Sequence, residues 1–162
     1  HAAFAHADAP LFLFHLLEFS KKPFTLDIEE LNARWADPEM IDRWSQMVIK
    51  HTEDNVDIIT QAPQSGIYKM LPDGRVVFDR FDYHRRAVES EDEAFFLRIS
   101  NGGDYRYEGA DLGILVTRGR SMTKSFQLTP KAKQWIDGIK NAYAARPLPS
   151  AAVLEDPAFK IM

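Results

Sequence analysis

Apolar and polar positions follow two different periods along this chain. In the N-terminal third, apolar residues recur at spacings of three and four, which is typical of helices that bury one face. From about Val56 onward, short apolar runs are separated by turn residues, which indicates strands. The helical spacing returns near the C-terminus. This order of helices, strands and one last helix predicts an α+β fold with a mainly antiparallel sheet of about five or six strands.

Three helices are expected before the strands begin. Leu11–Phe19 follows Asp8 and Pro10, an N-cap and a first-turn proline. Because this segment is apolar nearly all round, we expect it to be buried or to bind a partner. A second helix ends near Trp35. A third begins at Asp37-Pro38 and carries the apolar stripe Met40, Ile41, Trp44, Met47 and Val48.

The clearest strand signal is a hairpin. Ile67–Leu71 and Arg75–Phe78 flank Pro72-Asp73-Gly74, where proline sets φ and glycine accepts a positive φ. Further strands are expected at Val56–Thr60, Ala94–Ser100 and Leu112–Thr117, and the last of these is apolar enough to be central. Thr129-Pro130 predicts the start of a final helix with the stripe Ala132, Trp135, Ile136, Ile139 and Tyr143.

We expect a single domain. Residues 1–8 are interpreted as a flexible lead-in or a tag remnant, residues 9–145 as one α+β domain, and residues 146–162 as a proline-containing tail. If His1 is a native terminus, its amine and ring can chelate copper together with a second histidine. The candidates for that second ligand are His6, His15, His51 and His84.

Composition restricts the function classes. A net charge of −4 and a pI near 5.7 argue against nucleic-acid binding by bulk charge. The chain has no cysteine, which excludes disulfides, thiolate metal sites and cysteine nucleophiles. It also suits the cytoplasm, whereas a processed His1 would indicate the periplasm or secretion. No apolar run approaches the roughly 20 residues of a membrane span.

The densest chemistry lies in Phe78–Arg86. If strand alternation continues, it places Arg80, Asp82 and His84 on one face and Asp79 on the other. Asp82 and His84 are therefore the candidate catalytic pair, with His84 as the acid–base group. The two aspartates would point apart, so no metal site is expected. The candidate ligand-binding residues are Arg80, Tyr83, Arg85 and Arg86. The alternative is a strand end whose charges are solvated.

No motif in the chain identifies a reaction. The first hypothesis is a soluble, non-catalytic binding or regulatory module with an unknown ligand and cofactor, which binds a protein partner or a second copy through Leu11–Phe19. The second hypothesis is a hydrolase or nuclease that uses Asp82 and His84.

A third hypothesis comes only from the order of the predicted helices and strands. Three helices followed by the hairpin Ile67–Phe78 resemble a winged helix, and Leu115–Trp135 resembles the wing and helix that end this fold. The resemblance implies nucleic-acid binding through a recognition helix over Pro38–His51. That helix would carry Glu39 and Asp42 against two cations, Arg43 and Lys50, whereas DNA-reading helices present more donors.

Overall fold

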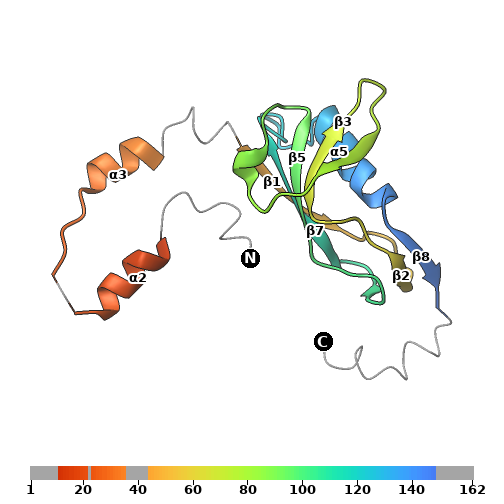
Figure 1. The fold of residues 1–162 in the computed structure, drawn as a ribbon, viewed down its shortest axis with the longest axis horizontal. Coiled ribbons are helices and arrows are strands. Elements are labelled where there is room, and N and C mark those ends of the chain that lie inside the picture. The colour runs from red at the N-terminus through yellow and green to blue at the C-terminus, as the bar shows by residue number, and fades with distance from the viewer. Residues whose placement is uncertain (1–10, 22, 36–43, 149–162) are drawn as a thin grey trace.

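The computed structural model describes residues 11–21, 23–35 and 44–148, and it has the expected α+β class (Figure 1). Among these residues, eight strands form two antiparallel sheets, and a helix follows the last long strand. The elements are α2 (Leu11–Phe19), α3 (Ile28–Trp35), β1 (Trp44–Lys50), β2 (Asp57–Gln61), β3 (Gly66–Met70), β4 (Val76–Arg80), η1 (Arg85–Ala87), β5 (Glu93–Arg98), β6 (Tyr105–Arg106), β7 (Asp111–Arg118), α5 (Pro130–Asn141) and β8 (Ala144–Pro147).

The larger sheet has the strand order β1-β7-β5-β3-β4, and every neighbouring pair is antiparallel. The prediction that Leu112–Thr117 forms a central strand is confirmed, because β7 lies between β1 and β5 and is buried from Leu112 to Thr117. The smaller sheet has the order β6-β2-β8. Both sheets therefore lack the parallel crossovers of a nucleotide-binding α/β fold.

The predicted hairpin is β3–β4, and its turn works as expected. Gly74 N–H donates to the Leu71 carbonyl, and Leu71 N–H donates to the Arg75 carbonyl. Gly74 has φ +85°, so this is a turn that ends in a glycine in the left-handed region. Asp73 Oδ1 accepts from Arg75 N–H at 3.0 Å, which stabilises the corner. The local sequence therefore specifies this hairpin.

The helix expected from Asp37 is wrong over the part that the structure describes. Residues 44–50 form strand β1, and residues 36–43 lie outside the described ranges. Met47 and Ile49 are buried while Gln46 and Val48 are exposed, which is a period of two. The stripe misled because Trp44 and Val48, four residues apart, share a face in either structure. Pairing with β7 then satisfies the strand's backbone groups.

Helix α5 covers one face of the larger sheet. Thr129 Oγ1 accepts from Ala132 N–H at 3.2 Å as the N-cap, and Pro130 is the first helical residue, so the predicted start is confirmed. Trp135 and Ile139 are fully buried against Met47, Tyr68 and Phe96 among others. A second cluster lies on the opposite face of the sheet and comprises Ile67, Val88, Phe95, Ile114 and Val116.

The tail expected after α5 begins with a strand. Ala144–Pro147 forms β8, which pairs with β2 and extends the smaller sheet. Its prolines suggested a tail that lies along the surface, but Pro147 is the last residue of an edge strand, where proline is tolerated. The rest of the tail, residues 149–162, lies outside the described residues.

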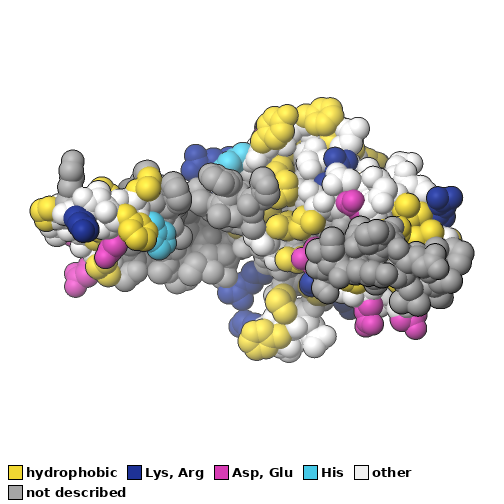
Figure 2. All heavy atoms as spheres, turned by 90° about the horizontal axis from the view of Figure 1, so that it is seen from below, with side chains coloured by type: hydrophobic (Ala, Val, Ile, Leu, Met, Phe, Trp, Pro, Cys, Tyr) yellow, Lys and Arg dark blue, Asp and Glu magenta, His cyan; other side chains and the backbone are white. Residues whose placement is uncertain are grey.

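Helix α2 is present as predicted, and its described side chains are exposed. Leu16 and Phe19 are 50% and 81% accessible, and Figure 2 shows hydrophobic side chains at the surface of the part of the molecule that carries α2 and α3. This exposure is consistent with the predicted partner surface, which stays a prediction. At nine residues, α2 is far too short to cross a bilayer, and the other described helices do not qualify either.

Gly113→Ala tests the packing between β7 and β5. A Cβ at Gly113 would lie 2.3 Å from the Phe96 ring and 2.8 Å from the Leu97 carbonyl oxygen, so we expect a loss of about 2–3 kcal/mol in the free energy of unfolding. The control is Gly102→Ala, where the nearest atom is at 3.7 Å. Urea denaturation measures both, and equal stabilities for the two variants would contradict the packing described here.

Candidate functional site

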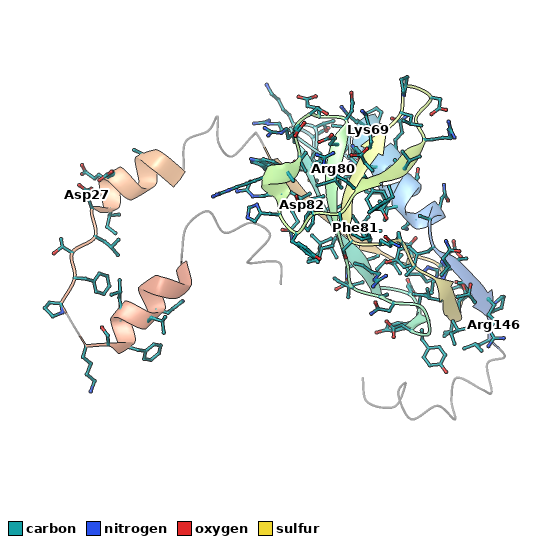
Figure 3. The ribbon with its side chains drawn as sticks, in the orientation of Figure 1. Asp27, Lys69, Arg80, Phe81, Asp82 and Arg146 are labelled. Carbon is teal, nitrogen blue, oxygen red and sulfur yellow. The ribbon has the colours of Figure 1, made fainter. Side chains whose placement is uncertain are left out.

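The predicted catalytic residues Asp82 and His84 lie in a loop, and not on a strand. Strand β4 ends at Arg80, so the expected alternation that would align Arg80, Asp82 and His84 is wrong beyond that residue (Figure 3). Asp82 Oδ1 accepts from the backbone N–H groups of Tyr83 and His84 at 2.7 and 2.9 Å. His84 Nδ1 accepts from Arg86 N–H at 3.0 Å and caps the short helix η1. Both side chains therefore shape the local backbone.

Arg80 binds the segment that follows η1. Its NH2 donates to the Ala87 carbonyl at 2.6 Å, and its guanidinium also contacts both carboxylate oxygens of Glu93 at 3.1 and 3.2 Å. Glu93 is buried and accepts from Glu89 N–H at 2.8 Å. The side-chain hydrogen bonds from Arg80 hold the pKa of Glu93 below its ordinary value. Arg80 is thus committed to an internal ion pair.

Two further arginines meet on Trp44. Arg118 donates from Nε and NH2 to the Val88 carbonyl at 2.9 and 2.8 Å. The guanidinium carbons of Arg118 and Arg85 each lie 4.7 Å from the Trp44 ring centroid, within cation–π range. Arg85 is only 6% exposed. We call Arg80, Arg85 and Arg118 the arginine cluster; it fastens residues 84–89 to the sheet face opposite α5.

The other predicted binding residues face solvent. Tyr83 is 90% exposed, and Arg86 is also exposed. The neighbouring Phe81 is 67% exposed and contacts the Phe78 ring edge-on at 5.1 Å. The predicted cluster therefore divides into arginines that hold the backbone and residues on the surface. No residue of the predicted cluster lines either of the two pockets that are described below.

A polar pocket lies elsewhere, where three elements meet. It has a volume of about 480 Å³ and lies between the end of β1, strand β6 and the last turns of α5. We call it the His51 pocket. Lys140 Nζ donates to Thr52 Oγ1 at 3.2 Å across its edge. The lining residues are His51, Glu53, Arg106, Leu112, Asp137, Lys140, Asn141 and Tyr143.

A continuous series of hydrogen bonds connects two of the lining residues, His51 and Arg106. His51 Nε2 lies 2.9 Å from Asn55 Oδ1, and Asn55 Nδ2 donates to Asp57 Oδ2 at 3.0 Å. The same oxygen accepts from Arg106 Nε and NH2 at 3.0 and 2.7 Å. His51 and Asp57 are 4% and 3% exposed. Asp57 Oδ1 is buried and has no hydrogen-bond partner among the described residues.

This series determines the tautomer of His51. Asn55 directs its NH₂ group toward Asp57 Oδ2, so its carbonyl oxygen faces His51. That oxygen only accepts, so His51 Nε2 must carry the proton. With the proton on Nε2, Nδ1 is the ring nitrogen that can accept a hydrogen bond. The ring is held with a defined acceptor atom.

Tyr143 fastens the end of α5 beside this pocket. Its hydroxyl donates to the Leu112 carbonyl at 2.7 Å and lies 3.4 Å from the Ser100 carbonyl. Burial raises the pKa of Tyr143 above its ordinary value, so the phenol keeps its proton and remains a donor. The pocket wall is therefore linked to the central strand β7.

The sequence did not indicate this pocket. His51 was expected at the end of a helix and considered only as a copper ligand, while His1 and His6 lie outside the described residues. Among the residues that the structure describes, no group of three or more potential metal ligands occurs. The one local signal for a binding site is the polar stretch His51–Asp57 between β1 and β2, which contains one histidine, one asparagine and three acids.

Glu93→Gln tests the ion pair that anchors residues 84–89. A carboxyl whose pKa is lowered on folding stabilises above its unfolded pKa of about 4.3 and loses that contribution as pH falls through the folded pKa. We expect the variant to be less stable by about 1–3 kcal/mol at neutral pH, with the difference shrinking below about pH 4. Urea titrations at both pH values measure it. The exposed Glu89→Gln is the control, and a pH-independent difference would contradict the ion pair.

Comparisons of this chain's sequence with protein-family models and with curated proteins, and of its fold with solved structures, found no match. A functional proposal for this chain therefore depends on the arrangement of its own side chains.

Proposed function

We propose that this protein is a binding module for a small polar ligand, and that the ligand binds in the His51 pocket. The observation that supports this most strongly is the hydrogen-bonded series from Arg106 through Asp57 and Asn55 to His51, which ends at the pocket wall. The bonds to Asp57 Oδ2 and Asn55 hold the His51 and Arg106 side chains in one geometry relative to each other. A rigid polar wall of this kind suits recognition.

The charges around the pocket indicate the class of ligand. Arg106 and Lys140 supply donors, while Asp137 and Glu53 supply carboxylates, so the lining is balanced in charge. A ligand with both a negative and a positive or donor group, such as an amino acid, matches this balance better than a simple anion. A volume of about 480 Å³ lies within the range of pockets for small molecules.

A binding role agrees with the chemistry of the lining residues. They include no serine, threonine or cysteine that could act as a nucleophile, and Tyr143 uses its hydroxyl proton on the Leu112 carbonyl. His51 Nδ1 is then an acceptor for a ligand N–H or O–H group. This is the non-catalytic binding module expected from the sequence, with its site moved from His84 to His51.

Ligand binding can be tested by NMR with free amino acids and small carboxylates as probes. We expect backbone amide shifts to concentrate around His51, Arg106 and Lys140. In His51→Gln and Lys140→Gln, affinity for the best probe should fall about tenfold or more, because a charged or oriented hydrogen bond is lost. His84→Gln is the matched control and should leave affinity unchanged. Shifts centred on residues 82–86 would instead support the sequence-predicted site.

Asp57→Asn tests the buried carboxylate within the same series. Removing the charge leaves Arg106 largely buried without its ionic partner, so we expect a loss of about 3 kcal/mol in the free energy of unfolding. Asp111→Asn removes the same charge from the exposed pair with Lys50, and should cost about 1 kcal/mol or less. Denaturant titrations of both variants give the comparison. Equal losses would show that the Asp57–Arg106 pair does not support the pocket.

A further inference from the structure

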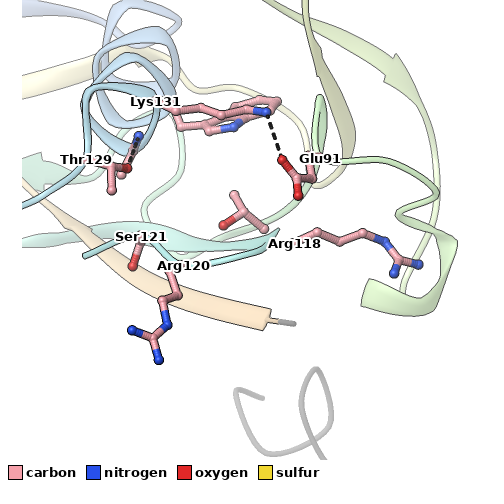
Figure 4. A pocket seen from close by; sticks show the side chains of 9 residues that line it. Glu91, Arg118, Arg120, Ser121, Thr129 and Lys131 are labelled. Carbon is pink, nitrogen blue, oxygen red and sulfur yellow. Dashed lines mark hydrogen bonds and ion pairs between the residues drawn. The ribbon is translucent and has the colours of Figure 1, made fainter. Parts of the chain in front are cut away.

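A second, much smaller cavity lies where strand β7 ends and α5 begins (Figure 4). Its volume is about 20 Å³, whereas a single water needs roughly 10–15 Å³. It therefore admits one oxygen-sized group. We call it the indole niche, after Trp135. The lining residues are Glu91, Thr117, Arg118, Arg120, Ser121, Thr129, Lys131, Ala132 and Trp135.

Trp135 brings a buried donor to this niche. The residue is 1% exposed, and its Nε1 has no hydrogen-bond partner among the described residues. An indole N–H can only donate, so it calls for an acceptor atom. Leaving such a group unpaired in the interior costs about 1–3 kcal/mol. Trp135 is one of the residues that line the niche, so an acceptor held there lies next to its indole ring.

The other groups in the niche are also suited to an acceptor. Thr117 is 5% exposed and presents a hydroxyl. Thr129 Oγ1 already accepts from Ala132 N–H, so its own proton is directed elsewhere. Ser121 adds a third hydroxyl. All three lie beside the N-terminus of the 12-residue helix α5, whose partial positive charge favours an anion.

We propose that the indole niche binds one oxygen of a small tetrahedral oxyanion, phosphate or sulfate, through Trp135 Nε1–H and the hydroxyls of Thr117 and Ser121. The site is separate from the His51 pocket and does not depend on the function proposed for it. The enclosed space receives a single oxygen, and the remaining oxygens lie at the rim beside Lys131, which is partly exposed. Hydroxyl, indole and helix-terminal donors can hold an anion without an arginine pair.

The charged side chains at the rim determine how strongly the niche is expected to bind an anion. Arg118 and Arg120 direct their guanidinium groups away from the niche in Figure 4, and Arg118 is bound to the Val88 carbonyl. Lys131 Nζ lies 2.9 Å from Asp92 and 3.8 Å from Glu91. Glu91 therefore opposes an incoming anion while Lys131 attracts it. Neutralising each in turn should change the affinity in opposite directions, which water in the same space would not do.

The experiment follows the indole N–H signal of Trp135 by NMR, with sodium phosphate and sodium sulfate added against sodium chloride at matched ionic strength. The signal is assigned by its loss in Trp135→Phe, or from backbone-linked assignments if that variant does not fold. We expect a saturable shift with phosphate or sulfate and none with chloride. Absence of that shift at millimolar anion means that the niche holds water only, and it overturns the proposal.

Variants then separate specific binding from general charge effects. Thr117→Val and Ser121→Ala should each weaken phosphate about tenfold, because each removes a hydrogen bond to a charged ligand. Lys131→Gln should weaken binding and Glu91→Gln should strengthen it. The matched controls are Lys133→Gln and Glu89→Gln, exposed residues outside the niche lining with the same charge changes. If each control changes affinity as much as its partner, the binding is non-specific and the proposal fails.

Discussion

Strand β7 is the constraint on which the rest of the structure depends. It pairs with β1 on one side and with β5 on the other, and a slip of one residue would reverse every buried side chain. Gly113 leaves the space that the Phe96 ring occupies. The same strand contacts the His51 pocket, the arginine cluster and the indole niche. His51 is held by backbone hydrogen bonds to Gly109 and Ala110 just before β7, while Thr117 and Arg118 lie at its far end.

The charge-rich stretch after β4 is explained by backbone hydrogen bonding. Residues 84–89 cross a sheet face with one short helical turn, in which the His84 and Arg85 carbonyls accept from the N–H groups of Ala87 and Val88. The carbonyls of Ala87 and Val88 come after that turn and need other donors. Arg80 and Arg118 supply the donors for Ala87 and Val88. A dense run of arginines and aspartates in sequence therefore need not indicate a reaction. Here it reflects the requirements of a segment that lies on an apolar surface.

Local signals predicted much of the fold and little of the site. The Pro72–Gly74 turn and the Thr129-Pro130 cap each depend on the conformations of a few adjacent residues, so their interpretation was confirmed. Strand β1 was missed because its apolar residues fit a helical stripe as well as an alternating one. The hydrogen bonds that select the strand come from β7, more than 60 residues away, and local propensity does not report them.

The sequence by itself determined the α+β class, the β3–β4 hairpin, the final helix and the absence of thiol chemistry. These follow from composition and from interactions within a few residues. Only the tertiary structure decided which charged groups meet. Asp57 and Arg106 are 49 residues apart, and they are brought together by the pairing of β2 with β6. Thr117 and Trp135 meet because α5 folds back over the sheet. Side-chain convergence of this kind depends on strand order and register, which no local pattern of apolar and polar residues encodes.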